Sequence, residues 1–478
     1  MADILKTGGV EKSAVAGTNG NPLGTERIGK LMLRFGIPAA VSMLVNAVYN
    51  LTDQVVVGNI VGMLGIAATN ISFPLMTISA AITYLFGSGG ASNYNLRLGE
   101  GNKEAANIIA CNTLSLLAIS GTIIGIIVLI FVHPLVFAFG ATETVKPLAL
   151  TYTTIIAIGI PFGVFSAGAC YIIRADGNPR YAMICTLSGA VFNMIADPVT
   201  AFVFKWGIAG IAWATTAGQI MTTGIAVYYF MKKTRHIAIT KEWLLPKLKL
   251  AKRISSLGIA ACVQQLGTTV AQITMNNTLR YYGAFTIYGS NIPLGCVGAI
   301  SKLSAIHMAI TIGIAMGCQP INSFNYGAKQ YNRVKKTLRM AITAASLISI
   351  AVFLAYQLIP RALMFIFGEN DPLYLEFALR YLRIFMFMTF ASGVQPVVAT
   401  FFPSIGNAKF GTLIALSRQI LFIVPLLIIL PLFYGLDGAL YAGPVSDFLA
   451  ASISATLVVI EMRSLRTVRE QGLGIRDQ

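Results

Sequence analysis

Two aspartates interrupt stretches of sequence that are otherwise almost wholly apolar. Asp53 lies in Asn50-Leu-Thr-Asp53-Gln, and Asp197 follows Asn193 by four residues and directly precedes Pro198. Insertion of a charged side chain at the middle of a bilayer costs about 2.5–3.5 kcal/mol. Such residues therefore occur in membrane helices where a binding partner or a function compensates for that cost. The spacing of four residues places Asn193 and Asp197 on one face of a helix.

Three kinds of chemistry fit these residues. Asp53, Asn193 and Asp197, with a carbonyl freed by Pro198, supply the oxygen ligands that a hard cation such as Na⁺ prefers. Alternatively, burial favours the neutral form of a carboxyl group and makes it a proton carrier. The third interpretation is a purely structural hydrogen-bonded pair. The same carboxyl groups serve Na⁺ and H⁺, so the sequence leaves the two ions open.

The composition of the chain determines what surrounds these acids. Of the 478 residues, 56% are hydrophobic and only 11% are charged, with a mean hydropathy of +0.73. Soluble domains carry about 25% charged residues, so a soluble protein of this length would lack polar surface. Intrinsic disorder is excluded because the chain has too much apolar surface. An all-α protein that crosses the membrane many times remains.

Apolar runs of about 20 residues recur along the chain, each long enough to span a bilayer as a helix. They predict twelve transmembrane helices, at 34–58, 64–90, 106–132, 147–172, 181–203, 208–231, 254–279, 291–318, 340–359, 378–402, 410–432 and 438–460.

Basic residues predict how these helices are oriented. Most of the 35 lysines and arginines fall in the N-terminal tail, in every second loop and in the C-terminal tail. Basic loops mark the cytoplasmic side, so both termini are predicted to be cytoplasmic. The net charge of +17 is therefore interpreted as a membrane-orienting rim. Binding of nucleic acid is not expected, because no loop is long enough to form a basic domain.

A repeat divides the chain into two halves. Phe-Ala-Phe-Gly at 137–140 recurs as Phe-Ile-Phe-Gly at 365–368, Gly99 recurs as Gly327, and Gly177-Asn178 recurs as Gly406-Asn407. The nearly constant offset predicts two parallel lobes of six helices, an architecture suited to alternating access. The expected organisation is an N-terminal tail (1–26), an N-lobe (27–231), a basic cytoplasmic linker (232–253), a C-lobe (254–463) and a C-terminal tail (464–478).

The repeat assigns the acids to one lobe. It pairs Asp53 with Met275 at an offset of 222 and Asp197 with Pro425 at an offset of 228, so any ion coupling is expected in the N-lobe alone. Weaker candidates, for a substrate cavity, come from polar or flexible side chains within the spans. They are Gln54, Met275, Asn276, Lys302 and His307.

Enzymatic chemistry is not indicated. The three histidines and six cysteines are dispersed, no catalytic triad or nucleotide-binding motif occurs, and no cofactor is implied. An ATP-driven pump would in addition need a soluble nucleotide-binding domain.

Several motifs resemble the multidrug and toxic compound extrusion (MATE) family. These are Asn93-Tyr-Asn-Leu-Arg97-Leu-Gly99 after the second span, its copy Ser323-Phe-Asn-Tyr-Gly327 after the eighth, and the Phe-Gly and Gly-Asn elements of the repeat. The resemblance covers about residues 25–460.

The resemblance implies a transporter that exports cationic, amphipathic compounds in exchange for Na⁺ or H⁺. In the bacterial branch with acids in the N-lobe, the coupling site matches Asp53, Asn193, Asp197 and Thr215 here. Another branch carries a glutamate in span 7, where this chain has Gln264, Gln265 and Gln272.

The leading hypothesis is thus a monomeric antiporter in the bacterial cytoplasmic membrane. The principal alternative is a flippase for a lipid-linked precursor, from the same superfamily, whose cavity would be net basic. A membrane receptor or scaffold is a third hypothesis.

Overall fold

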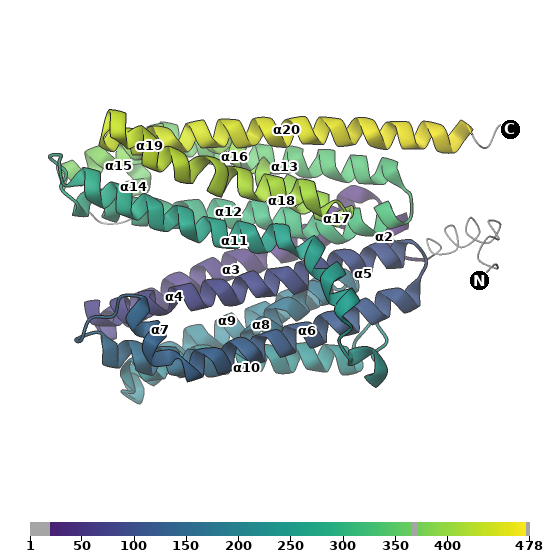
Figure 1. Ribbon diagram of the computed structural model, residues 1–478, viewed down its shortest axis with the longest axis horizontal. Helices are drawn as coiled ribbons and strands as arrows, with labels where there is room; N and C mark the ends of the chain where they lie inside the picture. Colours follow the sequence, from purple (N-terminus) through teal and green to yellow (C-terminus); the bar gives the residue numbers. More distant parts are fainter. Residues whose placement is uncertain (1–19, 366–370, 475–478) are drawn as a thin grey trace.

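The computed structural model describes residues 20–365 and 371–474, and every regular element in these ranges is helical (Figure 1). Most of the predicted N-terminal tail and part of the Phe-Ile-Phe-Gly motif lie outside the described residues. The predicted C-terminal tail begins inside the last helix, which continues through Gly474.

The helices follow the twelve predicted apolar runs. The first half contains α2 (Pro22–Thr25), α3 (Ile28–Ile60), α4 (Met63–Thr83), η1 (Tyr84–Ser88), α5 (Gly89–Gly99), α6 (Lys103–Ile130), α7 (Val132–Ala138), α8 (Lys146–Ala175), α9 (Pro179–Pro198), η2 (Val199–Val203), α10 (Gly207–Lys232) and η3 (Lys241–Leu244). The second half contains α11 (Leu248–Gly283), α12 (Asn291–Gly327), α13 (Tyr331–Leu358), α14 (Pro360–Phe365), α15 (Pro372–Ile384), α16 (Thr389–Ser392), α17 (Val394–Ser404), α18 (Ala408–Leu416), η4 (Ser417–Ile423), α19 (Val424–Tyr434) and α20 (Leu436–Gly474).

Ten helical spans within the described residues are long and apolar enough to cross a membrane. An eleventh is the pair formed by α15 and the segment Thr389–Ser404, bent by 53°. The remaining predicted span, at 208–231, corresponds to α10, whose 26 residues include many polar ones. The hydroxyls of Thr216 and Thr223 donate to the carbonyls of Ile155 (3.2 Å) and Phe162 (2.9 Å) on α8. Neighbouring helices thus satisfy the polar side chains that reduce the hydropathy of α10.

Two segments predicted as loops are helical instead. The motif after the second span forms α5, and its copy after the eighth span is the end of α12. Asn93 donates to the carbonyls of Gly89 (3.0 Å) and Arg253 (3.2 Å), and Asn325 donates to that of Ile321 (2.7 Å). Because these side chains bond the preceding turn and an adjacent segment, polar sequence continues the helix beyond the apolar run.

The chain forms two layers, with the first half below and the second half above in Figure 1. One hydrophobic core comes only from the first half, between Ala68 and Ala212, and another only from the second, between Ala271 and Ala442. A third core combines side chains of the first half with Ile254, Met316 and Phe324. The halves are therefore separately packed bodies joined by a shared core.

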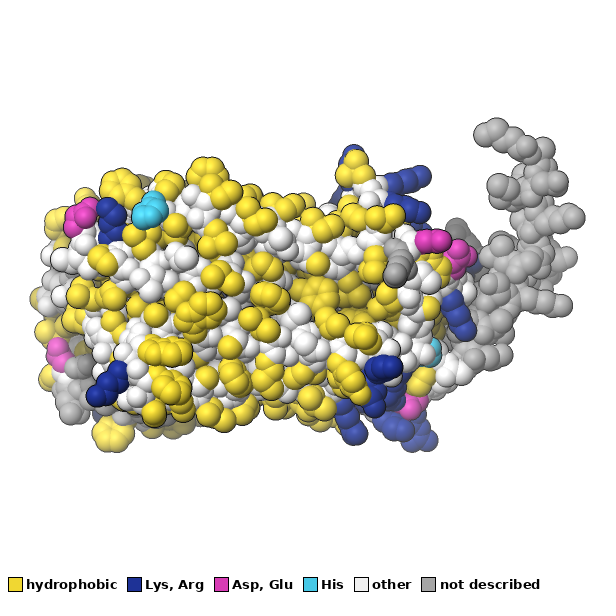
Figure 2. Space-filling model, turned by 90° about the horizontal axis from the view of Figure 1, so that it is seen from below, with side chains coloured by type: hydrophobic (Ala, Val, Ile, Leu, Met, Phe, Trp, Pro, Cys, Tyr) yellow, Lys and Arg dark blue, Asp and Glu magenta, His cyan; other side chains and the backbone are white. Residues whose placement is uncertain are grey.

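The surface agrees with insertion into a bilayer. Figure 2 shows a face on which hydrophobic side chains cover the middle, while Lys and Arg gather toward the end that carries the chain termini. Exposed large side chains such as Ile126, Phe202 and Val203 are about half or more accessible, as expected where lipid covers them.

At the end that carries the termini, glycines bring the two halves together. A Cβ added to Gly99 would lie 2.1 Å from the carbonyl oxygen of Phe324, and one added to Gly327 would lie 2.1 Å from that of Leu96. Gly99 on α5 thus lies against α12, and its repeat partner Gly327 on α12 lies against α5. Gly258 is similarly close to the backbone of Leu85.

Hydrogen bonds also join the two halves near these glycines. The Nε2 atom of Gln319 on α12 donates to the carbonyl and hydroxyl of Ser88 (3.0 and 3.1 Å) and to the hydroxyl of Ser92 (2.8 Å). All three residues are buried. Such hydrogen bonds are favourable because the alternative is an unsatisfied group in an apolar environment.

The segment between the halves is fastened to the first half. The carboxylate of Asp176 accepts hydrogen bonds from the backbone N–H groups of Arg235 (2.7 Å) and His236 (2.8 Å) and from the hydroxyl of Tyr229 (2.6 Å). Asn112 accepts from the N–H of Lys247 at 2.9 Å. The segment thus stays with the first half until the start of α11.

We expect Gly327→Ala to destabilise the protein by about 1–3 kcal/mol, because the added methyl group overlaps the backbone of α5. Gly298→Ala, in the same helix, is the matched control, since nothing lies within 4 Å of its added Cβ. That control should be neutral or slightly stabilising, because alanine is the better helix former. Thermal unfolding in detergent measures both, and equal midpoints for the two variants would contradict the close contact.

Candidate functional site

The two predicted acids meet inside the first half. Asp53 comes from α3 and Asp197 from the last turn of α9, and both are buried, with Asp197 fully inaccessible. Their carboxyl groups interact directly. Asn193, one turn before Asp197, donates to the Oδ1 atom of Asp197 (3.2 Å) and to the hydroxyl of Thr215 on α10 (3.1 Å). The structure thus brings together all four residues that the resemblance implied.

Several oxygens in this cluster have no hydrogen-bond donor. Asp53 Oδ1, Asp197 Oδ2 and Asn193 Oδ1 are buried and unpaired, and within residues 20–365 and 371–474 no Lys or Arg forms an ion pair with either acid. Burial of such acceptors costs several kcal/mol unless a positive group or a donor is supplied. Unpaired carboxylate and amide oxygens are the ligands that suit Na⁺, and two neighbouring carboxyl groups can instead share a proton.

Tyrosines complete the cluster, and the sequence analysis missed them. Tyr49, one turn before Asp53, interacts with both acids and hydrogen-bonds with Thr215. Tyr152 on α8 is 3% exposed and lies within electrostatic reach of the same acids. The spacing of four between Tyr49 and Asp53 was the available signal, since it places a hydroxyl on the face of the acid.

The helix changes its winding directly after the acid. Pro198 ends α9, and Val199–Val203 form the π-helical turn η2. The hydroxyl of Thr200 donates to the carbonyl of Asp197 at 3.1 Å. Single π turns within helices often occur at functional sites, and this one directly follows Pro198.

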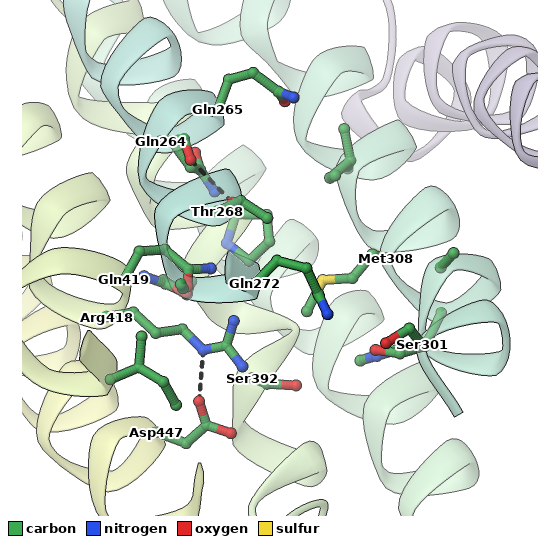
Figure 3. Close-up of a pocket in the computed structure, with 18 of the residues that line it drawn as sticks. Gln264, Gln265, Thr268, Gln272, Ser301, Met308, Ser392, Arg418, Gln419 and Asp447 are labelled. Atoms are coloured by element: carbon green, nitrogen blue, oxygen red, sulfur yellow. Dashed lines mark hydrogen bonds and ion pairs between the residues drawn. The ribbon is translucent and has the colours of Figure 1, made fainter. Parts of the chain in front are cut away.

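A cavity of about 400 Å³ lies in the second half (Figure 3). Of the predicted cavity residues, Met275 and His307 line it, and the His307 Nε2 atom lies 2.9 Å from the hydroxyl of Ser349. Gln54, Asn276 and Lys302 are not among its lining residues. Gln54 instead donates to Thr69 (3.4 Å), and Asn276 accepts from Gln272 (3.1 Å). The cavity is rich in amides, namely Gln264, Gln265, Gln272, Gln319, Gln395 and Gln419.

An ion pair that the sequence analysis did not anticipate lies in this cavity. The Arg418 Nε atom on η4 donates to Asp447 Oδ1 on α20 at 2.5 Å, and Figure 3 shows the pair at the cavity wall. Asp447 is 7% exposed. Because the two charges neutralise each other, the cavity carries no free ionic group from this pair. An arginine inside the predicted span 410–432 was itself the missed signal.

A second cavity, of about 250 Å³, lies in the first half and reaches the acidic cluster. Tyr49, Asn193 and Thr215 are among its lining residues. Tyr84, Tyr171 and Met316 line both cavities and so form a partition between them. The Tyr171 hydroxyl lies 4.0 Å from the Met316 sulfur, and the rings of Tyr84 and Tyr171 pack edge to face.

Known proteins resemble this chain over nearly its whole length. "Multidrug export protein MepA" of Staphylococcus aureus is 22% identical over 439 residues, covering 92% of this chain and 95% of that protein. The same-named protein of Staphylococcus haemolyticus is 22% identical over 444 residues, covering 93% and 96%.

Solved structures match the fold equally well. An outward-facing multidrug resistance MATE transporter of the MOP superfamily superposes with a TM-score of 0.84 and 22% identity, covering 95% of this chain and 99% of the other. A MOP superfamily transporter from Pyrococcus furiosus, described as having a binding pocket of reversed polarity, gives 0.85 and 22%, covering 95% and 98%.

The family model MatE matches residues 38–199 and 261–429, one segment in each half of the structure. The first segment contains Asp53, Asn193 and Asp197. The second segment covers most of the second half, in which the cavity of about 400 Å³ lies. The chain belongs to the MATE family of membrane transporters.

Proposed function

We propose that this protein is a secondary active multidrug efflux antiporter, which exports cationic amphipathic compounds in exchange for Na⁺ or H⁺. The observation that carries the proposal is the set of unpaired oxygens of Asp53, Asp197 and Asn193. A site that lacks its own counter-charge binds a cation and releases it again, as a coupling site must.

The position of α3 supports a link between ion binding and movement of the two halves. Asp53 lies on α3, which also packs closely against α12 of the second half: a Cβ on Gly313 would lie 2.3 Å from the Cα of Ala40. A cation that draws Asp53 and Asp197 together changes the position of α3 relative to α9. That change is transmitted to the interface between the halves. Exchange follows if ion and drug favour opposite states.

The cytoplasmic face is assigned to the end that carries the termini. Lys and Arg gather at this end in Figure 2, in agreement with the rule that basic residues stay inside. The reciprocal contacts of Gly99 and Gly327 close that end. The structure then corresponds to a state closed toward the cytoplasm of a bacterial cell.

Asp197→Asn should reduce efflux of ethidium from cells by about tenfold or more, which corresponds to roughly 1.4 kcal/mol of lost coupling free energy. The amide keeps the shape of the side chain but removes one of the two charges that attract the ion. Glu143→Gln is the matched control, because Glu143 is an exposed acid of the same half, with its side chain 84% accessible. Wild-type efflux by Asp197→Asn at normal expression would refute the coupling role.

In proteoliposomes with separately imposed gradients, one of Na⁺ or H⁺ should drive dye transport, and Asp53→Asn should abolish the response to that ion. The reason is that both carboxyl groups contribute to one site. A response to either gradient that survives in Asp53→Asn would separate the acid from coupling.

If the protein were a flippase, its function would depend on basic residues of the cavity and not on Asp53. It requires a basic cavity with Lys302, Arg380 and Arg383 facing it, whereas none of the three is among the lining residues and Arg380 pairs with Asp437 at 2.7 Å. Lys302→Ala should therefore leave dye efflux within about twofold of wild type, as expected for a surface substitution. Loss of function in Lys302→Ala, with normal function in Asp53→Asn, would favour the flippase.

A further inference from the structure

Arg174 is a buried basic residue beside the cavity of the first half. It belongs to the last turn of α8, is only 4% exposed and lines the cavity of about 250 Å³. Its guanidinium carbon lies 4.6 Å from the centre of the Tyr171 ring, so the group stacks on the partition between the two cavities.

Within the described ranges, the guanidinium of Arg174 takes part in no ion pair and donates no hydrogen bond to the protein. Asp176, two residues away, is fully engaged with the N–H groups of Arg235 and His236 and the hydroxyls of Tyr229 and Tyr94. The cavity reaches the acidic cluster through Tyr49, Asn193 and Thr215, which are among its lining residues. Arg418 shows the contrasting case, since Asp447 neutralises it.

The local structure offsets only part of the cost of burying this charge. A cation in the last turn of a helix gains about 0.3–1 kcal/mol from the helix dipole, and a cation over an aromatic ring gains about 0.5–2 kcal/mol. Burial of an unpaired ion costs several kcal/mol. The five donors of the guanidinium fork are therefore available to an anionic group that enters the cavity.

The dimensions of the cavity define what can bring that group. Cys170, one turn before Arg174, lies beside Thr186 (3.9 Å), and both line the cavity. From Thr186 to Asn193, α9 rises about 10 Å. A molecule of at least this length can place an anionic group at Arg174 and a cationic group at Asn193 and Thr215, beside the acids, with its apolar body against Met43 and Tyr84.

We propose that Arg174 binds the carboxylate of an amphoteric, amphipathic substrate whose cationic end lies toward the Asp53–Asp197 cluster. This inference rests on the proposed efflux function and adds a second point of recognition to it. The planar guanidinium matches a carboxylate with two parallel hydrogen bonds, which a lysine at the same place would not provide.

The test uses two dyes that differ only at the carboxylate. Tetramethylrhodamine has a cationic chromophore and one free carboxylate, and in its methyl ester the carboxylate is masked. Binding of each dye to the purified, detergent-solubilised protein is measured by fluorescence anisotropy, which needs no ion gradient and no coupling. Arg174→Gln should weaken binding of the free acid by about tenfold or more, the factor expected for a lost charge-assisted hydrogen bond. Binding of the ester should change by less than about twofold.

Arg180→Gln is the control variant, because Arg180 is an exposed arginine six residues along the chain and outside the cavity. It should leave the binding of both dyes unchanged. Arg174→Lys, which retains the charge but not the fork, should weaken the free acid relative to the ester even if Arg174→Gln does not fold.

Equal affinity of wild type and Arg174→Gln for the free acid overturns the proposal, including the case in which neither binds. Equal weakening of both dyes also overturns it, because that pattern is a general loss of structure. Either result leaves the Asp197→Asn efflux experiment to decide the antiporter function on its own.

Discussion

The carboxyl groups of Asp53 and Asp197 need a positive charge that no described residue of the protein supplies. The elements around them follow from this requirement. α3 and α9 hold one acid each, Asn193 and Thr215 fix the rotamer of Asp197 by a chain of hydrogen bonds, and the π turn η2 interrupts the backbone beside it. On the proposed function, the cost of burying two like charges makes the site dependent on an external cation, so the site would alternate between loaded and unloaded states.

The two halves use opposite solutions for charge within the membrane. The first half leaves its acids and Arg174 without an ion pair between them, and its cavity is lined by Arg174 and by Asn193 and Thr215 of the acidic cluster. The second half joins Arg418 to Asp447 and surrounds them with amides, which bind many partners weakly because each amide both donates and accepts. The two halves, which the sequence repeat pairs, therefore differ in the charges that they hold. Met275, opposite Asp53 in the repeat, illustrates this, since a flexible apolar side chain stands where the first half has an acid.

Much of this architecture could be predicted from hydropathy and spacing. The apolar runs located the helices because backbone groups in lipid must form their hydrogen bonds within a helix. The i, i+4 spacing of Asn193 and Asp197 predicted their contact. Two features escaped prediction for physical reasons. Polar α5 and the end of α12 are helical because tertiary hydrogen bonds replace hydropathy there: Asn93 donates to the carbonyl of Arg253, and Asn325 donates to that of Leu23. Tyr49 and Tyr152 are aromatic residues in apolar helices, where such residues draw no notice. The spacing of Tyr49 and Asp53 was a signal for the first, whereas only the three-dimensional structure places Tyr152 within electrostatic reach of the acids.

The partition of Tyr84, Tyr171 and Met316 has a kinetic consequence. Both cavities are bounded by these three side chains, so a molecule in either one presses on the same wall from its own side. Aromatic and thioether groups yield to such pressure, because methionine is flexible and the edge-to-face ring contact is weak. Compounds that occupy different halves would then impede each other through these three shared side chains. In a mixture, their mutual inhibition would follow a non-competitive law, and the order in which they arrive would decide which leaves the cell.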